Sequence, residues 1–179
     1  ADLIVVPSHL VKEQYDAYGR SLGSSVRVEV LPYPLRPDLG QQLDSDEVAS
    51  RMNQLDAASG ELIRVAIPIS GAAVGTDYFL SLIRDLRGKS DRFRFHIVSK
   101  DAPYTRDFLA RLGQESWVDI HAAGIDREVV DAYDDLYNAH GISLEVTKPS
   151  EQAFKALLGT NLRGGSILLF SWTNQNKPA

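Results

Sequence analysis

The sequence has 179 residues, 44% hydrophobic and 24% charged, as expected for one soluble domain or for one domain with part of another. It contains no cysteine, which excludes disulfides, thiolate metal sites and a cysteine nucleophile. The net charge of −5 comes without the basic stripe of a nucleic-acid-binding protein, and no apolar run approaches the about 20 residues that a membrane-spanning helix needs.

The first segment, "ADLIVVPSHL", begins with an apolar run typical of a strand and lacks the basic start and the cleavage site of a secretory signal. We therefore expect a cytoplasmic protein. Because the run starts in mid-strand without a methionine, we also expect the chain to be a fragment of a longer protein. We expect no bound metal, because HExxH spacing is absent among the histidines, which are His9, His96, His121 and His140.

Short runs rich in Val, Ile and Leu alternate with amphipathic stretches along the chain. The runs predict strands at 3–7, 26–34, 62–70, 93–99, 117–123, 142–146 and 166–171. The stretches between the later runs predict helices at 76–88, 101–113, 126–141 and 150–159. Strands that alternate with helices through short connections predict an α/β fold, in which a doubly wound parallel sheet carries helices on both faces.

The helix predicted at 76–88 has an N-cap candidate in Thr76 and a stop signal in Gly88. Its apolar stripe is formed by Tyr78, Phe79, Leu82, Ile83 and Leu86. The next helix should begin near a proline and end at Gly113.

The first 60 residues follow a different pattern. The stretch "LPYPLRPDLGQQLDSD" has three prolines within six residues and predicts an extended linker. Residues 1–40 are therefore interpreted as the end of one unit with a Pro-rich linker, 41–60 as a linker helix, and 61–179 as a second domain.

In a doubly wound sheet, ligands bind outside the carboxyl ends of the strands. The strand at 62–70 leads into "SGAAVGTD", where Ser70, Gly71, Gly75 and Thr76 open a helix whose free N–H groups suit a phosphate. Ala73 stands where a GxGxxG pattern has its second glycine. A tight turn that uses glycine for geometry alone is the alternative.

The strand at 142–146 leads into "TKPSEQAFKAL". Thr147 or Ser150 can cap the following helix, and Glu151 in its first turn suits the helix dipole. Lys148 at the positive end of a helix is unfavourable unless an anion binds there. We interpret Lys148 and Glu151 as partners for a phosphate and for sugar hydroxyls, with helix capping as the alternative.

Other polar groups are assigned less specific roles. The last strand is followed by stacking and amide groups suited to carbohydrate, or by an exposed tail, at Trp172, Asn174, Gln175 and Asn176. Lys100 and Asp101 are predicted to lie in a solvated loop. A solvated helix face is predicted for the acidic cluster of Asp131, Asp134 and Asp135.

Several of these stretches together resemble glycosyltransferases of the two-Rossmann-domain (GT-B) type. "ADLIVVPSHLVKEQYDAYG" and "SVRVEVLPYP" are similar to the last strand and helix of the acceptor domain and its linker. "ISGAAVGTDYFLSLI" and "EVTKPSEQAFKALLGTNLRGGSILLF" resemble the Rossmann-like donor half in the branch of monogalactosyldiacylglycerol synthase and cell-wall N-acetylglucosaminyltransferases. Both the glycine turn and the "TKPS" loop are poorer in glycine than in that branch.

The resemblance implies the donor-binding portion of a hexosyltransferase that uses a UDP-sugar or another nucleotide-sugar and needs no further cofactor. It implies that Ser70, Gly71, Gly75 and Thr76 face the diphosphate and that Lys148 and Ser150 lie beside it. It also implies that Glu151 binds the ribose and that Gln175 contacts the sugar. Because the acceptor site of this family lies mostly in the N-terminal domain, the isolated chain is expected to bind donor weakly and to transfer no sugar.

Other readings remain open. A degenerate Rossmann-like domain that acts only as a binding or interaction module is the main alternative, favoured by the sparse glycines of "SGAAVG". A nicotinamide-dependent enzyme needs GxGxxG and an acid after the second strand, and only the acid is present, as Asp101. A two-domain sugar-nucleotide epimerase is a further alternative that shares the fold.

Overall fold

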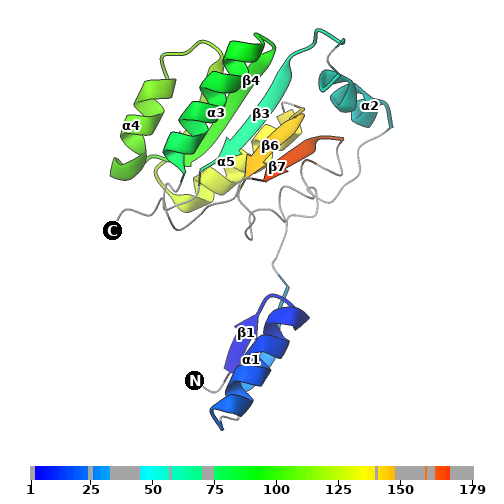
Figure 1. The fold of residues 1–179 in the computed structure, drawn as a ribbon. Helices are drawn as coiled ribbons and strands as arrows, with labels where there is room; N and C mark the ends of the chain where they lie inside the picture. Colours follow the sequence, from blue (N-terminus) through cyan, green and yellow to red (C-terminus); the bar gives the residue numbers. More distant parts are fainter. Residues whose placement is uncertain are drawn as a thin grey trace. The chain divides into compact units, whose positions relative to one another are not determined.

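The computed structural model describes residues 3–23, 26–32, 45–56, 58–69, 75–139, 141–147, 160 and 164–169. It divides the chain into two compact units, Ala1–Arg36 and Pro37–Ala179. Figure 1 shows the helices and strands of both units.

The first unit is a single strand–helix–strand motif. Strand β1 (Leu3–Val6) and strand β2 (Arg27–Val30) pair in parallel, and helix α1 (His9–Ser21) connects them. The helix starts where it does because the Ser8 hydroxyl accepts a hydrogen bond from the Val11 N–H at 3.3 Å. Val6 and Val28 are the apolar side chains that the described part of this unit buries.

The second unit contains a five-stranded parallel sheet with the order β5-β4-β3-β6-β7. All the strands predicted from apolar runs in this region are confirmed with small shifts of their ends. Their bounds are β3 Ile63–Pro68, β4 Phe93–Lys100, β5 Val118–Ala123, β6 Leu144–Thr147 and β7 Ser166–Leu169.

Helices cover both faces of this sheet, as the alternating pattern predicted. Helix α3 (Thr76–Lys89) and helix α4 (Pro103–Leu112) pack on one face through an apolar cluster that includes Phe79, Ile83 and Phe108. Helix α5 (Asp126–Ala139) packs on the opposite face, where Leu136 and two tyrosines meet Ala66 and Val98. The architecture is therefore doubly wound α/β. The helix predicted at 150–159 lies outside the described residues.

Local signals explain where these helices begin and end. Pro103 occupies the first turn of α4, and Gly113 follows its last turn, as predicted. Helix α3 differs from the prediction, because Gly75 rather than Thr76 is the N-cap and Gly88 lies inside the helix. Four members of its predicted apolar stripe pack into the core, namely Phe79, Leu82, Ile83 and Leu86. Leu80 is buried with them, whereas Tyr78 is 42% exposed.

The amino edge of the sheet is held by Arg92, which precedes β4. Its guanidinium donates to the Glu61 carbonyl at 2.7 Å and to the Gln54 and Asp56 carbonyls at 2.7 and 2.9 Å. These bonds join the connection between α2 (Ser45–Gln54) and β3 to the start of β4. Helix α2 is thus attached to the second unit.

Two glycines allow strand β7 to pack closely against the rest of the unit. Gly164 has a φ of +83°, and a Cβ there would lie 2.7 Å from the Val48 carbonyl oxygen. A Cβ on Gly165 would lie 2.4 Å from the Thr160 methyl carbon and 2.9 Å from the Ile142 carbonyl oxygen. Backbone must therefore move if either glycine gains a side chain.

We predict opposite effects for two glycine substitutions. Gly165→Ala should lower the free energy of unfolding by about 2 kcal/mol, because the new methyl group overlaps neighbouring atoms. Gly88→Ala should raise it by about 0.5 kcal/mol, because the site is helical and no atom lies within 4 Å of the added Cβ. Chemical denaturation of both variants checks the pair, and equal effects of the two substitutions would contradict the packing described.

Candidate functional site

The strand order reverses at the boundary between β3 and β6. From β3 the chain moves through α3, β4, α4 and β5 toward one edge of the sheet, and it then crosses back through α5 to β6. β6 pairs with the other side of β3, at Val65–Leu144 and Ala66–Glu145. In open α/β sheets this reversal leaves a crevice at the carboxyl ends of the two neighbouring strands, where ligands bind.

The chain leaves β3 at Pro68 and reaches helix α3 through Gly75. Gly75 has φ 88° and ψ 14°, in the left-handed region that glycine favours, and no side chain caps the helix there. Thr76 is the first residue of α3. The N–H groups of this first turn have no partner within the helix, so a 14-residue helix presents them and its positive dipole end at the carboxyl edge.

Gly75 and Thr76 are thus the predicted site residues that the structure describes, and both lie at this helix start. The other predicted site residues lie outside the described part of the chain; they are Ser70, Gly71, Lys148, Ser150, Glu151 and Gln175. Lys148 directly follows Thr147, the last residue of β6. The Thr147 side chain is 1% exposed, and among the described residues its hydroxyl makes no hydrogen bond.

Lys100 ends β4 at the same edge of the sheet. Its ammonium group donates to the Asp126 carboxylate at 2.8 Å, and this hydrogen bond together with the charge of Asp126 raises the pKa of Lys100. The next residue, Asp101, is exposed and contacts Arg106 at 3.4 Å. The solvated loop predicted here therefore begins one residue later, because Lys100 belongs to the strand.

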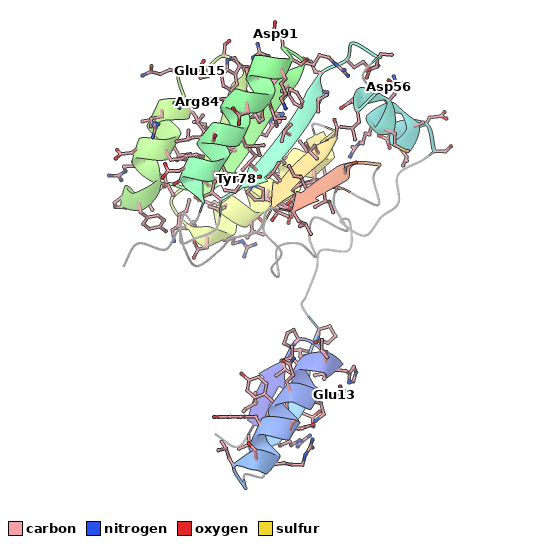
Figure 2. The ribbon with its side chains drawn as sticks, in the orientation of Figure 1. Glu13, Asp56, Tyr78, Arg84, Asp91 and Glu115 are labelled. Atoms are coloured by element: carbon pink, nitrogen blue, oxygen red, sulfur yellow. The ribbon has the colours of Figure 1, made fainter. Side chains whose placement is uncertain are left out.

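Figure 2 shows Tyr78, near the start of α3, at the end of the sheet opposite Asp91 and Glu115.

A buried carboxylate lies beneath helix α5. Glu145 of β6 is 0% exposed and accepts hydrogen bonds from the Tyr133 hydroxyl at 3.1 and 3.0 Å, from Tyr137, and from Thr160 at 3.2 Å. Burial, and then the charge of Glu145, raise the pKa of both tyrosine hydroxyls, so they remain protonated donors.

The acidic cluster on α5 is only partly solvated, which corrects the sequence prediction. Asp131 and Asp135 are exposed, but Asp134 is 0% exposed. In the sequence it follows Tyr133, which belongs to the buried cluster beneath α5. The sequence alone did not single out Glu145, Tyr133 or Tyr137.

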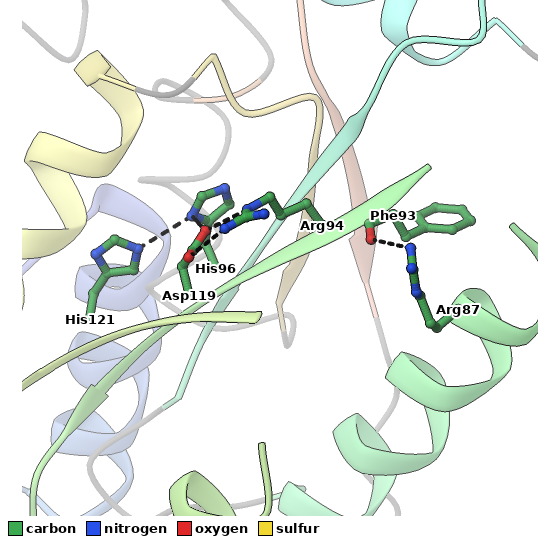
Figure 3. Close-up of polar contacts among 6 residues, drawn as sticks. All are labelled: Arg87, Phe93, Arg94, His96, Asp119 and His121. Carbon is green, nitrogen blue, oxygen red and sulfur yellow. Dashed lines mark hydrogen bonds and ion pairs between the residues drawn. The ribbon is translucent and has the colours of Figure 1, made fainter. Parts of the chain in front are cut away.

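Two histidines that are 25 residues apart meet on neighbouring strands (Figure 3). His96 Nδ1 lies 3.3 Å from His121 Nε2 and 3.6 Å from the Asp119 carboxylate. Asp119 also accepts two hydrogen bonds from the Arg94 guanidinium, both at 2.8 Å. The sequence carries a signal for this cluster, because side chains two residues apart in a strand face the same side of the sheet. Arg94 and His96 are spaced in this way, and so are Asp119 and His121.

The strand register connects the two clusters on the α5 face. His96 pairs with Asp119 on one side and with Ala66 on the other, and Ala66 pairs with Glu145. Across β5, β4, β3 and β6, this row of side chains is therefore polar except at Ala66, and Ile167 of β7 continues it as an apolar residue. Among the described residues, no group of three His, Asp or Glu side chains is placed to hold a metal ion.

Comparisons with known proteins find similarity among solved structures. No protein-family model and no curated protein matches the sequence. Among solved structures, the fold is similar to that of the Anabaena protein Alr3699/HepE in complex with UDP and glucose, with a TM-score of 0.46 and 15% identity. The match covers 93% of this chain and 44% of the Anabaena chain, so this chain spans less than half of that protein. UDP and glucose are ligands of the Anabaena protein, and a likeness of this degree carries no argument about activity.

No helix in the described ranges combines the length and the apolar character needed to cross a membrane.

We predict that Asp119 contributes a pH-dependent part of the stability. The hydrogen bond from Arg94 is the main cause that lowers the pKa of Asp119 below its ordinary value. A carboxylate whose pKa is lowered by folding stabilises the folded state at every pH above its unfolded-state pKa of about 4. This contribution is lost as the pH falls through the lower pKa of the folded state. The difference in melting temperature between the wild type and Asp119→Asn should therefore be largest at pH 7 and shrink below about pH 4.

Asp107→Asn, which changes an exposed aspartate on α4, is the matched control. A difference for Asp119→Asn that stays constant across the acid range would contradict the assigned role of the Arg94–Asp119 pair.

Proposed function

We propose that this chain is the nucleotide-sugar-binding part of a glycosyltransferase, which transfers a sugar from a nucleoside diphosphate donor to an acceptor. The observation that carries the proposal is the reversal of strand order between β3 and β6. The two stretches that the sequence marks as ligand-binding, "SGAAVGTD" and "TKPSE", follow these two neighbouring strands. Their resemblance to GT-B donor domains supports the same reading.

The start of α3 is the proposed diphosphate site. A helix N-terminus preceded by a glycine in the left-handed region, whose N-cap residue has no side chain, offers N–H donors and a positive dipole end to an anion. Ser70, Gly71, Gly75 and Thr76 are the residues proposed to face the phosphates. As the bond to the sugar breaks, negative charge grows on the leaving diphosphate, and these fixed donors stabilise it.

The segment that follows β6 supplies the remaining contacts in this proposal. Lys148 and Ser150 neutralise and hydrogen-bond the diphosphate, while the Glu151 carboxylate accepts hydrogen bonds from the ribose hydroxyls. Gln175 contacts the donor sugar. The buried hydroxyl of Thr147, directly before Lys148, makes this end of β6 polar, which supports a ligand-binding role for the carboxyl edge.

One observation favours a second candidate, a binding module that has lost its nucleotide. Asp77 lies in the first turn of α3, where its negative charge competes with a phosphate for the N–H groups and the dipole. A folded chain that binds neither UDP, GDP nor ADP, even within its longer protein, would favour this module over the donor site.

We predict that Lys148→Ala and Glu151→Ala each weaken the binding of UDP by about tenfold or more, because each removes a charge-assisted contact. Matched controls are Lys89→Ala and Glu115→Ala, which change exposed residues of the same types near the amino ends of the strands. Calorimetric titration of the chain, and of any longer protein that contains it, measures the dissociation constants. Unchanged affinity in the first pair, or equal losses in all four variants, would refute the proposed roles.

A further inference from the structure

The two histidines beneath α5 join an edge strand of the sheet to its neighbour. His96 belongs to β4 and His121 to β5, and among the described strands β5 pairs with β4 alone. In the register His96 lies opposite Asp119 and His121 lies opposite Val98, so the two rings meet diagonally across the strand pair. His96 is 2% exposed, whereas His121 is half-buried. The contact therefore extends from the margin of the sheet into its buried interior.

The contact between the rings has room for a single hydrogen atom. Nδ1 of His96 and Nε2 of His121 lie 3.3 Å apart and face each other (Figure 3). A neutral imidazole carries one N–H donor and one acceptor nitrogen, so either ring can donate to the other. A first added proton leaves this bond intact, because a protonated ring still donates to a neutral one. A second proton turns both facing nitrogens into donors, and the bond is then lost.

The nearby Asp119 carboxylate does not offset two protonated rings. It lies 3.6 Å from His96 Nδ1, but it already accepts two hydrogen bonds from the positively charged Arg94. The hydrogen bond from Arg94 is the main cause that lowers the pKa of Asp119, and the charges of His96 and His121 lower it further. Arg94 and both histidines thus act on the same carboxylate.

The other titratable groups around the pair come from four elements. On the strands the same face also carries Arg64 of β3, Lys100 of β4 and Glu145 of β6, while α5 buries Tyr133, Asp134 and Tyr137. Lys100 is paired with Asp126, and Glu145 accepts hydrogen bonds from the two tyrosines. Even with Asp134 counted, two protonated rings and Arg94 carry more positive charge than Asp119 and Asp134 offset.

We propose that the His96–His121 pair is a pH-sensitive contact, which holds β5 and α5 in place at neutral pH and releases them when both rings are protonated. β5 is the strand that moves, because it has one neighbour among the described strands and its half-buried His121 can turn toward water. Only Gly124 and Ile125 separate β5 from α5, so a displacement of β5 reaches the helix. The contact needs no ligand and is independent of the proposed function.

The direction of the pH effect follows from the number of bound protons. Below about pH 6.5, the ordinary pKa of histidine, both rings take up a proton in the unfolded chain. The folded contact accepts one proton and excludes the second, so the unfolded state binds more protons and stability falls as the pH decreases. Asp119 loses its charge only below about pH 4, because its pKa is lowered in the folded state. The histidine effect therefore lies at higher pH than the effect of Asp119.

The experiment compares the full wild-type chain with His121→Gln and His9→Gln. Amide hydrogen exchange is measured at about pH 7.5 and about pH 5, on either side of the histidine range, and is corrected for the pH dependence of exchange itself. In the wild type, protection of β5 and α5 should fall about tenfold at the lower pH relative to β3. His121→Gln should abolish this fall, because an amide can bond to His96 but takes up no proton. His9→Gln, which changes an exposed histidine of the first unit, should behave like the wild type.

A fall of the same size in His121→Gln, or a wild type in which β5 and α5 lose no more protection than β3, would overturn the proposal. Should His121→Gln not fold, the ring-nitrogen chemical shifts of the wild type decide the question. The proposal requires that uptake of the second proton coincides with the loss of protection in α5. Two protonated rings in a chain whose α5 stays protected would contradict it.

Discussion

The handedness of the connections between parallel strands is the constraint on which the arrangement of the second unit depends. Right-handed crossovers that lead from β3 to β5 place α3 and α4 on one face of the sheet. The crossover from β5 back to β6 runs in the opposite direction, so α5 must lie on the other face. As a consequence β6 lies beside β3, and the segments that follow both strands leave the sheet at neighbouring points.

The two faces of this sheet differ in chemistry. The face under α3 and α4 is closed by aliphatic and aromatic side chains. The face under α5 carries polar residues that include Asp119, His96 and Glu145, and these take part in hydrogen bonds with arginine, histidine and tyrosine side chains. Buried polar groups require specific partners, so they fix the positions of α5 and of the turn at Thr160 more narrowly than apolar packing alone does.

The fold could be predicted from the sequence because it depends on local patterns. Apolar runs marked every strand of the sheet, and Pro103 and Gly113 marked the ends of α4. The burial of Glu145 could not be predicted from such patterns, because Glu145 becomes a buried acceptor only through the pairing of β6 with β3 and the packing of α5. Asp134 was assigned to a solvated face for the same reason: its burial depends on the rotation of α5 about its axis.

The candidate site was predicted from motifs that follow β3 and β6, and the described residues Gly75 and Thr76 lie at a helix start suited to an anion. The central claim is that a nucleoside diphosphate binds at this carboxyl edge. It is tested most directly by following the backbone amide chemical shifts of the chain during titration with UDP. The account predicts saturable shifts at Gly75, Thr76 and Thr147, with Asp91 and Glu115 at the opposite edge unchanged. Saturable shifts centred at the opposite edge, or the absence of shifts in the folded chain, would contradict it.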